Sequence, residues 1–81
     1  MANRGMPARP NAAEMSQLCA AFNELYAIGD RIRAYPGAIG GELVDVEIVE
    51  PGAHVLGGHT AVVQVSGRGC IALTHIHGRA R

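Results

Sequence analysis

The chain has 81 residues, which is enough for one small domain but too few for two domains that each bury a core. Its seven basic and seven acidic side chains give a formal net charge of zero. This balance argues against a general nucleic-acid coat protein, a polyanionic DNA mimic and a membrane-surface protein, because each of these needs a net electric field. Aromatic residues make up only 4% of the chain, so we expect a core of small aliphatic groups and a homo-oligomer that adds stability.

No segment approaches the roughly 20 apolar residues of a membrane span, and the first residues lack the apolar stretch of a secretory signal. The two cysteines, Cys19 and Cys70, are too few for the disulfide framework of a small secreted domain. We interpret both as reduced thiols that pack with apolar neighbours. These features predict a cytoplasmic protein with no membrane partner.

A tail and a helix are expected at the start of the chain. Residues 1–10 contain two prolines, one glycine and two arginines without periodicity, which predicts a disordered tail. Asn11 can then cap a helix, and Glu14 can reach back to its N–H group as in a capping box. Four apolar residues recur at helical spacing: Met15, Leu18, Phe22 and Leu25. The sequence predicts an amphipathic helix over residues 11–28, with its stripe buried in the core or in an oligomer contact.

Short alternating segments separated by glycines follow the helix and predict β-strands. Residues 30–35 form the first strand, and residues 42–50 form the clearest one. The apolar face of this second strand holds Val44, Val46 and Ile48, and its polar face holds Asp45 and Glu47. The polar pair is expected to be a solvated surface rather than a catalytic pair of carboxylates.

The remaining segments are punctuated by turn residues. Pro51-Gly52 predicts a turn, and residues 54–59 have no clear pattern. A tight turn at Gly67-Arg68-Gly69 is expected to join a strand over residues 61–66 to a strand over 70–74. Residues 75–78 are expected to form one helical turn followed by a short strand.

These elements predict a mainly β fold with one N-terminal α-helix. Residues 29–81 are expected to form a small antiparallel barrel, and the helix covers its open end or supplies a partner surface. The alternative is an α+β sheet with the helix packed on one face.

Part of the barrel segment resembles a known family. The run Gly29-Asp30-Arg31-Ile32-Arg33, with Gly37-Ala38 and Gly41-Glu42-Leu43-Val44 after it, resembles the opening of the SH3-like barrel of plasmid-borne type II dihydrofolate reductases. The resemblance implies an SH3-like barrel. That family's activity depends on a Val-Gln-Ile-Tyr segment in the pore of a tetramer, with a lysine nearby. Here the strand reads Gly69-Cys70-Ile71-Ala72-Leu73, and Ala34 stands near the lysine position, so we expect no reductase activity.

A second resemblance covers most of residues 22–77. The segments Val55-Leu56-Gly57-Gly58-His59 and Val63-Gln64-Val65-Ser66-Gly67 are similar to small uncharacterised proteins of phages and other mobile elements. This resemblance implies an origin but no particular chemistry.

The histidines and cysteines do not predict a catalytic site, a metal site or a cofactor site. The four histidines, His54, His59, His75 and His77, lack the tight pairing with cysteine that is typical of zinc sites, and we expect them to be exposed or hydrogen-bonded. Cys70 as a nucleophile would need a base such as His59 or His75, and we expect it to point into the core instead.

One strand face combines cations with an aromatic ring. Arg31, Arg33 and Tyr35 share that face. If Arg68 and the terminal arginines gather there, they form a basic patch, and an opposing face with Asp45 and Glu47 would then make the barrel dipolar. We therefore expect a non-enzymatic binding module from a phage or mobile element that binds a protein partner. An anti-defence or anti-CRISPR-type inhibitor is a specific version of this hypothesis. The alternatives are a nucleic-acid-binding SH3-like module and a divergent relative of the type II reductases.

Overall fold

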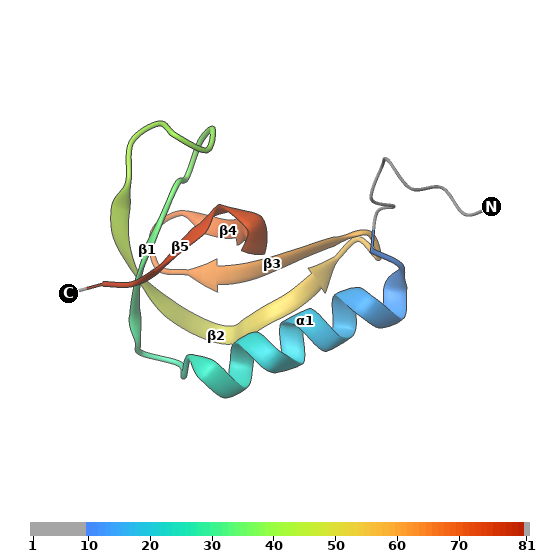
Figure 1. The fold of residues 1–81 in the computed structure, drawn as a ribbon. Helices are drawn as coiled ribbons and strands as arrows, with labels where there is room; N and C mark the ends of the chain where they lie inside the picture. Colours follow the sequence, from blue (N-terminus) through green and yellow to red (C-terminus); the bar gives the residue numbers. More distant parts are fainter. Residues whose placement is uncertain (1–9, 81) are drawn as a thin grey trace.

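The computed structural model describes residues 10–80 and contains one α-helix packed on a small antiparallel sheet (Figure 1). The elements are α1 (Ala12–Leu25), β1 (Arg31–Ala34), β2 (Val44–Leu56), β3 (Thr60–Val65), β4 (Gly69–Ala72), the 3-10 turn η1 (Leu73–His75) and β5 (Ile76–Arg79). The predicted fold class, mainly β with one N-terminal helix, is confirmed. Most of the predicted tail lies outside the described residues.

The strands form one five-stranded sheet in the order β4-β3-β2-β1-β5, with every neighbouring pair antiparallel. The fold is small and barrel-like, but the described strands do not close into a complete barrel, because β4 and β5 are the two edges of the sheet. The predicted hairpin around Gly67-Arg68-Gly69 is present, since Val65 pairs with Gly69. The predicted helical turn and short strand after it correspond to η1 and β5.

The start of α1 follows its predicted capping box. Asn11 Oδ1 accepts a hydrogen bond from the Glu14 N–H at 2.8 Å, and Glu14 Oε1 accepts one from the Asn11 N–H at 2.9 Å. Two N–H groups that the first helical turn leaves without partners are therefore satisfied. The helix ends at Leu25, a few residues before the predicted boundary, because Tyr26 already has extended backbone.

The buried side of α1 differs in phase from the predicted stripe. Met15 and Cys19 are each 6% exposed, and Phe22 and Tyr26 pack against the core. Leu18 and Leu25 are 50% and 63% exposed, so their predicted burial in this chain's core is wrong. The buried line follows residues 15, 19, 22 and 26, which is rotated towards the sheet compared with the predicted line through 15, 18, 22 and 25.

The core is aliphatic, as the low aromatic content predicts. The inward side chains of the strands alternate with outward ones, and the fully buried members with the largest side chains are Ile32, Ile48, Val63 and Val65. Val46 and Ile48 face inward as predicted, and Val44 packs at the margin of the core. Burial of Cys19 among these groups raises the pKa of its thiol.

The predicted turn at Pro51-Gly52 is wrong, because β2 continues through it to Leu56 with a shift in register between Ile48 and Ala53. A side chain of α1 supplies hydrogen-bond partners for the backbone at this irregularity. Asn23 Oδ1 accepts a hydrogen bond from the Ala53 N–H at 2.9 Å, and Asn23 Nδ2 donates one to the Ala53 carbonyl at 3.0 Å. Proline and glycine therefore mark a bulge, and the patternless segment after them is the end of β2 and its hairpin loop.

This contact leads to a prediction about two glycines with the same backbone angle. Gly52 and Gly58 both have φ +78°, but a Cβ at Gly52 would lie 2.7 Å from Asn23 Oδ1, whereas a Cβ at Gly58 would meet nothing within 4 Å. Gly58→Ala should lower the free energy of unfolding by about 1 kcal/mol through backbone strain alone. Gly52→Ala should cost about 3 kcal/mol, because it also displaces the Asn23 amide. Urea denaturation measures both, and equal losses would contradict the role given to Asn23.

Candidate functional site

An apolar groove runs between the exposed side of α1 and the turn η1. Its volume is about 340 Å³, and its lining residues are Leu18, Ala21, Phe22, Leu25, Leu73 and Thr74. We call it the helix groove. A second hollow of about 240 Å³ shares Leu18, Leu73 and Thr74 with it and continues towards the start of β3. The apolar surface is therefore extended rather than confined to one side chain.

The groove exists because the apolar surface of α1 is wider than the surface that the sheet covers. Leu18 and Leu25 lie seven residues apart on the same side of the helix, with the small Ala21 between them. Both leucines remain about half exposed or more, next to the buried line through Met15 and Cys19. A contiguous exposed patch of this kind is typical of interaction sites, and full burial of one such leucine contributes about 1.5–3 kcal/mol.

One acidic side chain, Glu14, lies beside the N-terminal end of the groove. The α1 segment contains Glu14 and Glu24 and no lysine or arginine. Glu14 also lines a shallow hollow with Pro10, Gln17 and Leu18 at the N-terminal end of the groove. A ligand lying along the groove would therefore meet the Glu14 carboxylate at its N-terminal end.

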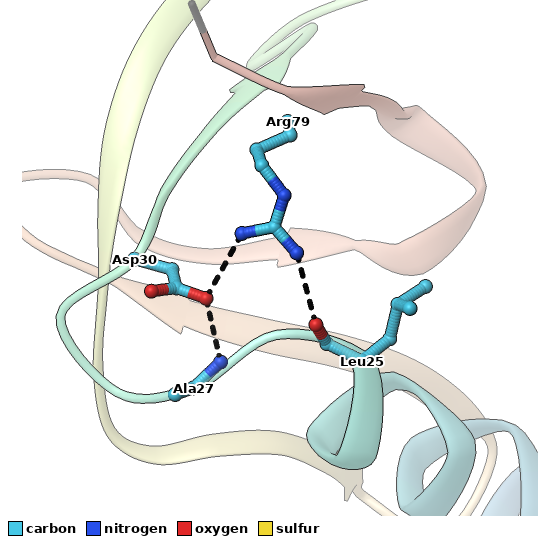
Figure 2. Close-up of polar contacts among 4 residues, drawn as sticks. All are labelled: Leu25, Ala27, Asp30 and Arg79. Atoms are coloured by element: carbon cyan, nitrogen blue, oxygen red, sulfur yellow. Dashed lines mark hydrogen bonds and ion pairs between the residues drawn. The ribbon is translucent and has the colours of Figure 1, made fainter.

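The C-terminal end of α1 is held to β5 by Arg79 (Figure 2). Arg79 Nη1 donates to Asp30 Oδ2 and Arg79 Nη2 donates to the Leu25 carbonyl, each at 3.1 Å. Its guanidinium also lies 4.8 Å from the centre of the Tyr26 ring. A cation bound to the last carbonyls of a helix complements the helix dipole, so Arg79 fixes the end of the groove formed by Leu25.

Asp30 completes this arrangement. Its Oδ2 accepts a hydrogen bond from the Ala27 N–H at 2.9 Å as well as from Arg79. The Ala27 hydrogen bond first, and Arg79 second, hold the pKa of the Asp30 carboxyl below its usual value of 3.8.

The predicted basic face is paired with the acidic strand rather than opposed to it. Arg31 pairs with Glu47 and Arg33 with Asp45 across β1 and β2. Residues that pair directly in an antiparallel sheet share one face, and Arg33 Nε donates to Asp45 Oδ1 at 2.9 Å. The predicted dipolar barrel is therefore wrong, because these charges cancel locally.

The other members of the predicted partner-binding set do not line the helix groove. Tyr35 follows β1 and presents its ring edge-on to His77, with 6.3 Å between ring centres. Arg68 is exposed in the turn between β3 and β4, next to Ser66, whose N–H donates to the Glu47 carbonyl. The role of Arg31, Arg33, Tyr35 and Arg68 in partner binding stays a prediction.

Cys70 does not point into the core. It pairs with Gln64 on the face of the sheet opposite to the buried Val63 and Ile71, and it is partly exposed. The histidine beside it is His54, at 3.9 Å. The two histidines considered as bases for Cys70 bond elsewhere: His59 Nδ1 lies 3.1 Å from Thr60 Oγ1, and His75 Nδ1 lies 3.0 Å from the Tyr35 carbonyl.

The sequence did not predict two features, one in the helix groove and one on the outer face of the sheet. Leu73 and Ala21 complete the helix groove, but only the return of the chain through η1 brings Leu73 to the helix. Gln64 joins Cys70 and His54 on the outer face of the sheet. The alternation of Cys70 with Ile71 carried that signal, because Ile71 is the more apolar residue and belongs in the core.

Comparisons with known proteins do not add an identity. No protein-family model, no curated protein and no solved structure matches the chain. The resemblances to type II reductases and to phage proteins stay predictions. Among residues 10–80, no helix has the length and apolar character needed to cross a bilayer, and no three histidine, cysteine or acidic side chains converge on a common point.

The Asp30 contacts predict a particular pH dependence. A carboxyl whose pKa is lower in the folded state stabilises the fold above its unfolded-state pKa, and this contribution disappears as the pH falls through the folded-state value. The melting temperature of wild type should therefore exceed that of Asp30→Asn at neutral pH, and the difference should shrink as the pH falls below 3.8. In an Arg79→Met background the difference at neutral pH should be smaller. A difference that does not change between neutral and acid pH would contradict this assignment.

Proposed function

We propose that the protein is a non-enzymatic module that binds a protein partner through the helix groove. The proposed occupant is an amphipathic helix with an apolar stripe flanked by lysine or arginine. The observation that carries this proposal is the continuous apolar groove beside a helix whose charged residues are all acidic.

The shape of the groove suits a helix as its occupant. Leu18 and Leu25 are separated by seven residues, which corresponds to about 10 Å along a helix axis. A partner helix that presents apolar residues at i, i+3 or i+4 and i+7 has anchors with the same spacing. Leu73 and Thr74 form the opposite wall, so the partner would lie between α1 and η1.

Charge favours a basic partner over a second copy of this chain. Packing α1 against α1 of another copy would bring two helices together that carry Glu14 and Glu24 and no lysine or arginine, so neither helix supplies a cation to pair with the Glu14 beside the groove. Like charges that meet in an interface oppose binding, whereas a lysine-flanked helix brings opposite charges to the same positions. The homo-oligomer expected from the composition therefore stays a prediction, and it is an outcome of the test below.

An anti-defence role is compatible with this proposal, whereas a nucleic-acid-binding role depends on a different surface. An anti-defence inhibitor from a phage or mobile element would need only such a docking face to cover a surface of its target. The nucleic-acid alternative depends on the cations of β1, and the cross-strand carboxylates of Asp45 and Glu47 weaken the field of Arg31 and Arg33. We therefore favour a protein partner.

A pair of synthetic peptides tests the proposal. One is an amphipathic helix with leucines at i, i+3 or i+4 and i+7 and lysines on both flanks, and its twin has glutamates in place of the lysines. The lysine peptide should bind wild type at least tenfold more tightly than its twin, a difference of about 1.4 kcal/mol in fluorescence anisotropy titrations. Leu18→Ser combined with Leu25→Ser should weaken binding of the lysine peptide by at least the same factor.

The control variant is Ile39→Ser. Ile39 is 61% exposed, close to the 63% of Leu25, but lies in the loop between β1 and β2, outside the residues that line the groove. Its replacement should leave peptide binding unchanged. Equal binding by the double variant and wild type, or by the two peptides, would overturn the proposal. So would light scattering that shows a wild-type dimer dissociated by the double variant, because a second copy would then cover the groove.

A further inference from the structure

Three different donor atoms converge on the outer face of the sheet, away from the helix groove. They are Cys70 Sγ, His54 Nε2 and Gln64 Oε1, and they come from the three neighbouring strands β4, β2 and β3. Cys70 Sγ lies 3.1 Å from Gln64 Oε1 and 3.9 Å from His54 Nε2, and His54 Nε2 lies 3.4 Å from Gln64 Oε1. We call this set the Cys-His-Gln cluster.

The size of this triangle matches the size of a transition-metal site. A triangle with sides of 3.1, 3.4 and 3.9 Å has a circumscribed radius of about 2.0 Å, so a cation near its centre would lie about 2.0 Å from each donor. A small displacement of the cation out of the plane lengthens these distances to about 2.1–2.3 Å, the range of zinc bonds to nitrogen, oxygen and sulfur. The three side chains therefore need little rearrangement to become ligands.

The chemistry of the donors also suits a cation. A thiolate, a neutral imidazole nitrogen and an amide oxygen can each donate a lone pair to a cation. In the metal-free protein the Cys70 S–H donates to Gln64 Oε1, and His54 Nε2 lies within hydrogen-bond distance of the same oxygen. A divalent cation can replace the S–H proton, which is released to water as the sulfur–metal bond forms.

The sheet holds the cluster in place. Gln64 and Cys70 are a direct cross-strand pair, and His54 pairs with Val62, two residues from Gln64 on the same face. Val62 is only 4% exposed, so a buried apolar residue lies beside His54 and Gln64 on this face. All three donor residues are partly exposed, which leaves a path for a metal ion and an open position for water or another ligand.

We propose that the Cys-His-Gln cluster is a zinc-binding site. Zinc accepts sulfur, nitrogen and oxygen ligands together and imposes no geometric preference of its own, which suits a mixed donor set with three protein ligands. The site is distinct from the four-histidine arrangement considered from the sequence, because it uses one histidine, one thiol and one amide.

Titration with zinc chloride against a chromophoric chelator tests the site, with cobalt(II) as a spectroscopic substitute. Wild type should bind one zinc ion, and cobalt(II) should give a sulfur-to-metal charge-transfer band. Cys70→Ser should abolish that band, and Cys70→Ser or His54→Phe should each weaken zinc binding by at least about tenfold. Gln64→Glu should strengthen binding by a similar factor, because a carboxylate replaces the amide at the third ligand position.

Matched controls use the other cysteine and two other histidines. Cys19→Ser, His59→Phe and His77→Phe should bind zinc like wild type, and circular dichroism verifies that every variant is folded. The proposal is overturned if wild type binds no zinc, or if Cys70→Ser keeps the affinity and the band. It is equally overturned if the His59 or His77 variants lose binding while the His54 variant keeps it, or if Gln64→Glu has no effect. None of these outcomes bears on the helix groove.

Discussion

The contact between the Asn23 amide and the backbone of Ala53 determines how the helix and the sheet fit together. At the bulge in β2 the strand ladder is interrupted, and the Ala53 N–H and carbonyl both bond to one side chain of α1. Buried backbone groups without partners are costly, so the bulge and the helix depend on each other. Gly52 makes the contact possible, because any side chain there would meet the Asn23 amide.

This contact also sets the rotation of α1 about its own axis. With Asn23 held against β2, Met15 and Cys19 turn towards the core and Leu18 and Leu25 turn towards η1 and solvent. Arg79 then fixes the far end of the helix to β5. The helix groove therefore depends on an apolar helix surface wider than the sheet covers and on two polar contacts that fix the rotation and the C-terminal end of α1.

Local features could be predicted from the sequence, and features that depend on pairing between distant segments could not. The capping box at Asn11 and Glu14 and the inward alternation of Val46 and Ile48 follow from neighbours in the chain. The ion pair in which Asp45 neutralises the charge of Arg33 depends on the register between β1 and β2. The position of Cys70 depends on which face of β4 meets the core. The larger apolar side chain of Ile71 indicates that face, but Cys70 and Ala72 on the other face are apolar residue types too, so the pattern of this strand is ambiguous.

The Arg79 contact has a consequence for the order of folding. Arg79 bonds to Leu25 across 54 residues of chain, and the strand that carries it also supplies the second neighbour of β1. During synthesis the helix and the β2–β3 hairpin can form from residues already outside the ribosome, but the helix end and the edge of β1 must wait for the last strand. Long-range closure of this kind slows folding compared with local pairing, so the half-made chain exposes its apolar helix side and an unpaired strand edge at the same time.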